Sequence, residues 1–369
     1  MAASGAEAAA ANSIKPTKLQ FLYQNCSSNV YQGRWVPDST NYPLYDSSAC
    51  PFIRREFDCL KYGRLDHQYL HYRWQPSDPG CTLPRFNGVE FLRRMKGKKI
   101  MFVGDSLSMN QYESLLCMLH AAAPNSNITR LAQPFPTVMF QDYGVSIMLF
   151  TSHYLVDIQQ DKIGRRVLNL GSVSSGNLWK QMDVLIFNTW LWWYRKGPKQ
   201  GWNYIRDGKI ISKDMNRMTA FTKALRTWAK WVDSSVDTRK TSVFFQGVSP
   251  AHYNGAAWGR PGVRDCSNET KPIAGGLTQS VVPLALKVQQ DIIGSIRKPV
   301  HFLNITAMSY MRKDGHPASH NGLGGMDCTH WCVAGVPDTW NHILSTILIH
   351  SGKRGKESKT LPRQTLAHK

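Results

Sequence analysis

Short apolar runs that each end in polar residues, with helical segments between them, constrain the fold most. The first run, at 98–106, reads KKIMFVGDS, and the next fourteen residues place Met109, Tyr112, Leu115, Leu116 and Leu119 on one helical face. Similar runs lie at 182–190 (MDVLIFNTW), 241–250 (TSVFFQGVSP) and 299–306 (PVHFLNIT). Such runs are typical of strands that helices cover on both faces. The alternation predicts an α/β fold with a mostly parallel sheet between helices.

Two later segments also show helical periodicity, while one segment shows an extended pattern. The helical ones have apolar residues at Met218, Phe221, Leu225, Trp228 and Val232, and at Trp340, Ile343, Leu344, Ile347 and Leu348. Residues 136–158 instead read as two extended stretches, which we expect to form an antiparallel addition to the sheet.

Residues 20–90 differ from the rest because they are loop-rich and contain four of the eight cysteines together with several prolines. We expect them to form a disulfide-stapled lobe packed on a catalytic domain at 91–350. Residues 1–19 are expected to be disordered or the remnant of a truncated segment, and the basic tail at 351–369 to be disordered. No stretch approaches 18 apolar residues, so we predict no membrane span.

The charge and the cysteines indicate the surroundings of the protein. A formal net charge of +20 favours a polyanionic partner. The sequence has no nucleic-acid-binding motif, and an acidic polysaccharide fits the charge as well. Eight scattered cysteines suit four disulfides in the secretory pathway, although 105 pairings are open. Glycosylation sequons at Asn25, Asn127, Asn268 and Asn304 are consistent with secretion.

Polar side chains follow three of the predicted strands, where ligands bind in open α/β sheets. These side chains are Asp105 and Ser106, then Asn188, then Gln246 with Ser249 and His252. Ser106 lies at a strand-to-helix turn, where helix N–H groups could stabilise a developing negative charge if a base activates the hydroxyl. The alternative is that Asp105 or Ser106 only caps the helix.

The block DCTHWC supplies a base for Ser106. Asp327 and His330 lie three residues apart, so the carboxylate could hold the imidazole in one tautomer while its other nitrogen faces the serine. Cys328 and Cys332 flank His330 in a pattern that could also bind zinc, but the other cysteines read as disulfides, and we predict no metal.

The block FNTWLWW, at 187–193, offers further candidates. The Asn188 amide could donate to an oxyanion. Tryptophans at this density are usually core residues, yet Trp190, Trp192 or Trp193 could face a cleft and stack on a sugar ring. Trp202 and Trp258 are weaker candidates of the same kind, while Gln246 and His252 are candidate substrate-binding residues.

Two blocks together resemble the plant trichome birefringence-like family, whose members are cell-wall polysaccharide O-acetyltransferases and relatives. The blocks are MFVGDSLSMNQYESLLCML (101–119) and DCTHWCVAGVPDTWNHIL (327–344). The similarity runs from about residue 25 to about 350 and includes CPFIRREFDCLKYGRLDHQYLHYRWQP (50–76) and LNITAMSYMRKDGHPASH (303–320). FNTWLWW and FFQGVSPAHY are similar to the branch of the family that is linked to pectin rather than to the branch that modifies xylan.

The resemblance implies a GDSL/SGNH-like three-layer fold of the PC-esterase superfamily and a role for each site residue. Ser106 would be the nucleophile, His330 the base and Asp327 the orienting acid, with Gly104, Asp105 and Cys328 in support. We expect the oxyanion hole to use the Ser106 N–H, Asn188 and Gly144. It further implies four disulfides, Cys26–Cys81, Cys50–Cys117, Cys59–Cys332 and Cys266–Cys328, and no cofactor.

These implications favour O-acetyl transfer to pectin or xylan through an acetyl-serine, from a donor of unknown identity. A pectin acetylesterase with the same three residues is the first alternative, and a non-catalytic pectin-binding wall protein is the second. Family members usually carry an N-terminal signal anchor, which the start of this chain does not resemble. The expected location is the Golgi or the cell wall.

Overall fold

A central sheet forms the middle of the molecule, and the computed structural model describes residues 30–274 and 283–351. Across the sheet the strands run in the order β13-β12-β9-β3-β6-β5-β4. In this order their bounds are His301–Leu303, Ser242–Gln246, Val184–Phe187, Lys99–Gly104, Val145–Thr151, Thr137–Phe140 and Ile128–Leu131. The four apolar runs coincide with β3, β9, β12 and β13, so the four predicted strands are confirmed. Burial is confirmed for β3, β9 and β12, whereas β13 lies at the edge of the sheet and is only partly buried.

Strand direction determines which strand ends meet at the same edge of the central sheet. Strand β3 lies between β6 and β9 and is parallel to both, with Gly104 opposite Thr151 of β6. Strands β12 and β13 continue the parallel part, whereas β5 and β4 are antiparallel additions. The antiparallel addition expected within 136–158 is therefore confirmed in part, because β5 is antiparallel to β6 but β6 itself is parallel to β3.

The expectation of a mostly parallel sheet is met only in part, because the described residues also form two other sheets. One is an antiparallel pair, β1 (Gly33–Pro37) with β2 (Tyr72–Pro76). The other has the order β11-β10-β8-β7 and mixes both directions. Its strands have the bounds Ile210–Ser212, Tyr204–Asp207, Arg166–Asn169 and Asp157–Gln160.

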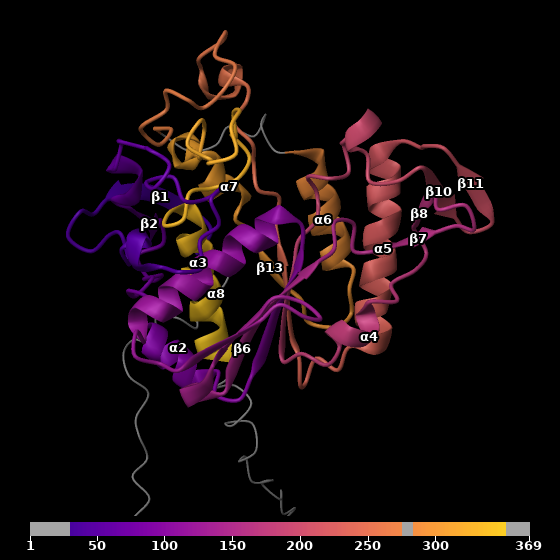
Figure 1. Cartoon of the computed structure of the whole chain (residues 1–369), viewed down its shortest axis with the longest axis horizontal. Coiled ribbons are helices and arrows are strands. Elements are labelled where there is room, and N and C mark those ends of the chain that lie inside the picture. Colours follow the sequence, from indigo (N-terminus) through magenta and orange to yellow (C-terminus); the bar gives the residue numbers. More distant parts are fainter. Residues whose placement is uncertain (1–29, 275–282, 352–369) are drawn as a thin grey trace, which may run out of the picture.

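Helices cover both faces of the central sheet, as Figure 1 shows. One layer contains α2 (Gly88–Arg94), α3 (Ser106–Ala122) and α8 (Val336–Ser351), and the other α4 (Gly176–Trp179), α5 (Arg217–Ser235) and α6 (Leu284–Gly294). Because side chains alternate along a strand, Ile100 and Phe102 of β3 pack with the first layer, while Met101 and Val103 pack with the second. This double burial explains the continuous apolar run.

Short helices connect the larger elements. Within the described residues they are α7 (Thr306–Tyr310) and the 3₁₀ turns η1 (Ser47–Ala49), η2 (Gln68–Leu70), η3 (Gln141–Tyr143), η4 (Gly197–Lys199), η5 (Gly255–Trp258) and η7 (Lys313–Gly315). None of the helices in the described ranges is long and apolar enough to cross a membrane.

The N-terminal lobe packs on the helical layer that contains α3 and α8 (Figure 1). Two disulfides join it to the rest of the chain, Cys50–Cys117 to α3 and Cys59–Cys332 to the loop before α8. With Cys266–Cys328, three of the four expected pairings are confirmed. The expected Cys26–Cys81 bond lies outside the described residues because Cys26 does, as do the sequon at Asn25 and the segments 1–19 and 352–369.

Candidate active site

The turn between β3 and α3 places Ser106 at the carboxyl edge of the sheet. Asp105 is the N-cap of α3, and its Oδ1 accepts a hydrogen bond from the Leu107 N–H at 3.0 Å. Ser106 is the first helical residue, so no carbonyl of the preceding turn accepts from its N–H. The capping role that the sequence left open thus belongs to Asp105, and the Ser106 hydroxyl is directed elsewhere.

Ser106 contacts a histidine that lies 224 residues away in the chain. Its Oγ donates to His330 Nε2 at 2.7 Å. His330 Nδ1 in turn donates to Asp327 Oδ2 at 2.7 Å. The three residues predicted as nucleophile, base and orienting acid therefore form one continuous hydrogen-bonded chain. This arrangement can move a proton from the serine to the imidazole while the carboxylate stabilises the resulting charge.

The Asp327 carboxylate is held in its ionised form. Partial burial acts to raise its pKa, but the hydrogen bond from His330, the charge of that imidazole and two backbone hydrogen bonds outweigh it and lower the pKa to about 2. The backbone donors are the N–H groups of Thr329 and His330, at 3.0 and 3.1 Å from Oδ1. Asp327 therefore remains an acceptor for the imidazole N–H over the whole physiological pH range.

Asn188 lies beside the turn and uses its amide to hold it. Its Oδ1 accepts from the Asp105 N–H at 3.1 Å and from Ser108 Oγ at 2.6 Å, and its Nδ2 donates to Asp105 Oδ1 at 2.8 Å. Gly104 is required for this close approach, because a Cβ there would lie 1.8 Å from Asn188 Oδ1. The predicted role of Asn188 as a donor to the oxyanion stays a prediction.

The expectation for Gly144 is wrong. This glycine precedes β6, and β6 is parallel to β3, with Ser146 opposite Lys99 at the start of both strands. Gly144 therefore lies at the amino edge of the sheet, about 20 Å from the edge that carries Ser106 at ~3.3 Å per strand residue. The loop that leaves the other end of β6, with His153, is the one beside the site.

A cleft of about 600 Å³ opens beside Thr329, which directly precedes His330. Its lining includes three cationic and three aromatic side chains, Arg166, Arg195, Lys199, Trp192, Tyr194 and Tyr253. Cations suit the carboxylates of an acidic polymer, and exposed aromatic rings suit the faces of sugars. No group of three or more His, Cys, Asp or Glu side chains placed to hold a metal occurs in the part of the chain that the structure describes.

Comparison with known proteins gives the family of this chain. Residues 83–347 match the PC-Esterase family, described as a GDSL/SGNH-like acyl-esterase family found in Pmr5 and Cas1p, and residues 24–82 match the PMR5 N-terminal domain. "Protein trichome birefringence-like 38" of Arabidopsis thaliana is 53% identical over 87% of this chain and 83% of its own length. "Protein trichome birefringence-like 41" of the same plant is 51% identical over 87% of this chain and 90% of its own length.

The chain belongs to the trichome birefringence-like family. The resemblance inferred from the two sequence blocks is thus confirmed. Membership in a PC-esterase family suggests acyl transfer or ester hydrolysis, which agrees with the Ser106–His330–Asp327 contacts.

Within this trichome birefringence-like chain, the three tryptophans of FNTWLWW have different environments. Trp193 is fully buried and its Nε1 donates to Thr189 Oγ1, so its predicted contact with substrate is wrong. Trp192 lines the cleft, but His153 stacks on it at 3.8 Å and the Arg195 guanidinium lies 3.9 Å from its ring centre. Two groups this close must cover opposite faces, which leaves only the edge of the Trp192 indole in the cleft.

The remaining candidate sugar-stacking residues are also less exposed than expected. Trp190 is half-buried and packs against Phe221 at 5.1 Å. Trp202 is buried under Tyr154, and the Trp258 indole Nε1 donates to Glu269. The exposed rings in the cleft are instead those of Tyr194 and Tyr253, at 48% and 41% exposure.

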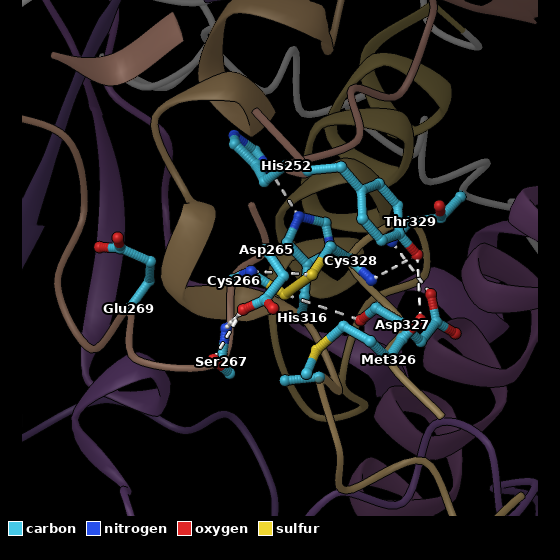
Figure 2. Close-up of a disulfide and its surroundings, with 12 residues drawn as sticks. His252, Asp265, Cys266, Ser267, Glu269, His316, Met326, Asp327, Cys328 and Thr329 are labelled. Atoms are coloured by element: carbon cyan, nitrogen blue, oxygen red, sulfur yellow. Dashed lines mark hydrogen bonds between the residues drawn. A yellow bond between two sulfur atoms is a disulfide. The ribbon is translucent and has the colours of Figure 1, made fainter. Parts of the chain in front are cut away.

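The expectations that Gln246 and His252 contact substrate are wrong, because both side chains are buried. His252 lies behind the predicted base, with its Nδ1 2.6 Å from His316 Nε2 (Figure 2) and its Nε2 2.8 Å from the Tyr310 carbonyl. His316 Nδ1 then donates to the carbonyl oxygen of His330 at 2.6 Å. Both histidines thus support the backbone of His330 from within the core.

The sequence analysis missed several residues around the site. Phe57, from the N-terminal lobe, has its ring 5.4 Å from the His330 ring. His316 is part of KDGHPASH, and Tyr253 follows His252 directly, so their motifs could have drawn attention to them. The cleft arginines could not have been found, because nothing in the sequence separates them from the other basic residues.

Proposed function

We propose that this chain is an O-acetyltransferase that acts on a plant cell-wall polysaccharide through an acetyl-Ser106 intermediate. The observation that carries the proposal is the 2.7 Å hydrogen bond from Ser106 Oγ to His330 Nε2, with His330 held by Asp327. A serine needs such a base to become nucleophilic, and an ionised carboxylate stabilises the imidazolium that forms. The three disulfides support a secretory location, the Golgi or the cell wall, for this activity.

The reaction proceeds in two displacements. His330 Nε2 takes the proton of Ser106 as Oγ attacks the acetyl carbonyl of the donor, and the same imidazole returns that proton to the leaving group. The Ser106 N–H, at the positive end of α3, stabilises the oxyanion, and Asn188 is the proposed second donor. In the second displacement, a sugar hydroxyl gives its proton to His330 as it attacks the acetyl-serine, and the imidazolium then returns that proton to Ser106 Oγ as the leaving group.

Hydrolysis is the second candidate, and the exposure of the site favours it. The side chains of His330 and Asp327 are 19% and 18% exposed, so water can reach the acetyl-serine. Transfer and hydrolysis differ only in whether a sugar hydroxyl or water attacks first, which depends on the affinity for the acceptor and on exclusion of water.

An acidic polysaccharide, with pectin favoured over xylan, is the proposed acceptor. The cleft beside Thr329 combines Arg166, Arg195 and Lys199 with the exposed rings of Tyr194 and Tyr253. A chain with net charge +20 also attracts a polymer of uronates at low ionic strength. Both observations support pectin, while a neutral xylan would use the aromatic rings alone.

Incubation with 4-nitrophenyl acetate, with and without unacetylated oligogalacturonide or xylo-oligomer, tests the proposal. Mass spectrometry should find acetylated oligomer and one added acetyl group on the peptide that contains Ser106. Acetate release at the same rate with and without the oligomers, and no acetylated oligomer, would establish an esterase instead. Ser106→Ala should lose turnover by ~10³-fold or more and keep its affinity for oligogalacturonide. Full turnover of Ser106→Ala would reject the acetyl-Ser106 intermediate. A wild type that binds oligogalacturonide but turns over no acetyl ester, with binding unchanged in Ser106→Ala, would reject both enzyme functions and leave a pectin-binding wall protein.

A further inference from the structure

Tyr253 reaches two different parts of the site. Its ring is 41% exposed and lines the cleft, where it offers a face to a sugar. Its hydroxyl lies on the segment that carries Asp327. Tyr253 is therefore placed to contact a ligand in the cleft and also to restrain Asp327, the residue that orients His330.

The Tyr253 hydroxyl bonds to the backbone on both sides of Asp327. It donates to the Met326 carbonyl oxygen at 3.1 Å and accepts from the Cys328 N–H at 3.0 Å. The Asp327 carboxylate itself binds the N–H groups of the next residues, Thr329 and His330. The direction of the carboxylate therefore depends on the backbone that Tyr253 holds.

Other restraints on this segment come from the buried side. Ala318 pairs with Asp327 through two backbone hydrogen bonds of 2.9 and 3.0 Å, and the His252 N–H donates to the Cys328 carbonyl at 2.9 Å. Cys328 is also bonded to Cys266 (Figure 2). These contacts hold the segment against the interior of the protein. The two hydrogen bonds of the Tyr253 hydroxyl differ from them, because they belong to a side chain that water reaches from the cleft.

We propose that Tyr253 is a positioning residue that couples occupation of the cleft by a polysaccharide to the orientation of Asp327. A sugar packed over the phenol ring excludes water from its hydroxyl, and hydrogen bonds strengthen when water no longer competes for the same groups. Asp327 is then held more firmly, and His330 stays aligned with Ser106. Filling the cleft thus accelerates acetylation of Ser106 as well as supplying the acceptor. The inference rests on the proposed function.

The burst of 4-nitrophenol from 4-nitrophenyl acetate tests this coupling, because it reports acetylation of Ser106 before any acceptor reacts. In the wild type, saturating unacetylated oligogalacturonide should raise the burst rate constant about 3- to 10-fold, as expected from firmer hydrogen bonds. Tyr253→Phe keeps the ring and should abolish the increase with less than a twofold change in oligogalacturonide affinity. Tyr194→Phe is the matched control, since it removes a hydroxyl from the same cleft and should keep the increase.

Two outcomes would overturn the coupling. One is a wild-type burst that oligogalacturonide leaves unchanged, and the other is a Tyr253→Phe variant that keeps the full increase. The Asp327→Asn background provides a further test, because Tyr253→Phe should cost nothing more there if it acts through Asp327. An additive loss would contradict the inference. Ser106→Ala should give no burst, and a burst from it would refute the proposed function rather than the coupling.

Discussion

Replacing Gly104 by alanine should strongly destabilise the protein. The added methyl would lie 1.8 Å from Asn188 Oδ1, 2.5 Å from Ser108 Oγ and 2.6 Å from the Asn188 carbonyl oxygen. Gly104 does not have a left-handed backbone conformation, so the cost is steric overlap and not torsional strain. Two of the three clashing atoms belong to Asn188, whose side chain joins Gly104, Asp105 and Ser108 into one buried cluster. Either the Asn188 side chain or strand β3 has to move.

The magnitude follows from the bonds that such a movement breaks. Asn188 takes part in three buried hydrogen bonds with Asp105 and Ser108. At about 1 kcal/mol for each bond, and about 1–3 kcal/mol for the overpacking, Gly104→Ala should lower the free energy of unfolding by about 4–6 kcal/mol. Such a loss is a large part of the ~5–15 kcal/mol that stabilises a typical protein.

Urea unfolding of the disulfide-intact protein, followed by tryptophan fluorescence, measures this loss. Gly294→Ala is the matched control, because Gly294 ends α6 and a Cβ there meets no atom within 4 Å. The control should change stability by less than about 1 kcal/mol, since alanine has a higher helix propensity than glycine. If Gly104→Ala lost under 1 kcal/mol, or no more than the control, the close approach of Asn188 to β3 would be refuted.

Two further predictions concern charge. Burial lowers the pKa of His342 to about 4, so its stabilising effect is complete above pH 6.5 and is lost as the pH falls toward 4. The stability of wild type relative to His342→Gln should therefore fall by about 3 kcal/mol between pH 7 and 4, and a difference independent of pH in urea unfolding would contradict this. Arg195→Gln should weaken oligogalacturonide binding about 3- to 10-fold at low salt and less at high salt, with xylo-oligomer binding unchanged. Arg239→Gln is the control, because Arg239 is exposed and pairs with Asp237. Calorimetric titration measures the affinity of both variants for oligogalacturonide, and an equal loss of affinity in both would exclude a role for Arg195 that is specific to the cleft.

The parts of the fold that sequence reasoning found are those in which a local pattern reports burial. The run that forms β3 is apolar throughout because helices cover both of its faces, and Gly104–Ser106 marks the turn beyond it. The four-stranded sheet gave no such signal. Its strands are short and carry exposed apolar residues such as Ile158 and Ile210, so neither a continuous run nor an alternating pattern stands out.

The wrong predictions at the site arise because the sequence shows neither the direction of a strand in the sheet nor the residue at which the strand ends. The sequence does not show at which edge of the sheet β6 begins, because strand direction is a property of the whole sheet, and so it could not exclude Gly144 from the oxyanion hole. The run at 182–190 predicts a strand that includes Trp190, and side chains alternate between the two faces along a strand, but β9 ends at Phe187. Alternation of sides therefore does not apply to Trp192 and Trp193, and tertiary packing decides which of them reaches the cleft.

His252 illustrates a further limit, because a polar side chain after a strand can be covered by chain that comes much later. It follows β12, as a site residue should, yet His316 and the Tyr310 carbonyl enclose it. The same later segment supports His330 from behind. The polar residue at position 252 therefore belongs to the region of the site, but its side chain makes buried contacts behind His330 and does not face the cleft.

The N-terminal lobe is part of the site and more than an appendage to it. Phe57 packs against the His330 ring, and its carbonyl oxygen accepts from the Val333 N–H at 3.0 Å. The buried Arg64 guanidinium donates to the carbonyl oxygens of His316 and Asp314 at 2.8 and 2.6 Å.

Each of these bonds joins the lobe to a segment 250 or more residues away, near the end of the chain. Forming them closes very long loops, which costs conformational entropy that only the assembled domain can offset. The lobe thus adds restraints on the loop that carries His330 to those from Asn110 of α3, which makes two hydrogen bonds with the Trp331 backbone. Residues 91–350 without the lobe would therefore keep the residues of the site but lose the contacts of Phe57 and Arg64 that support their alignment.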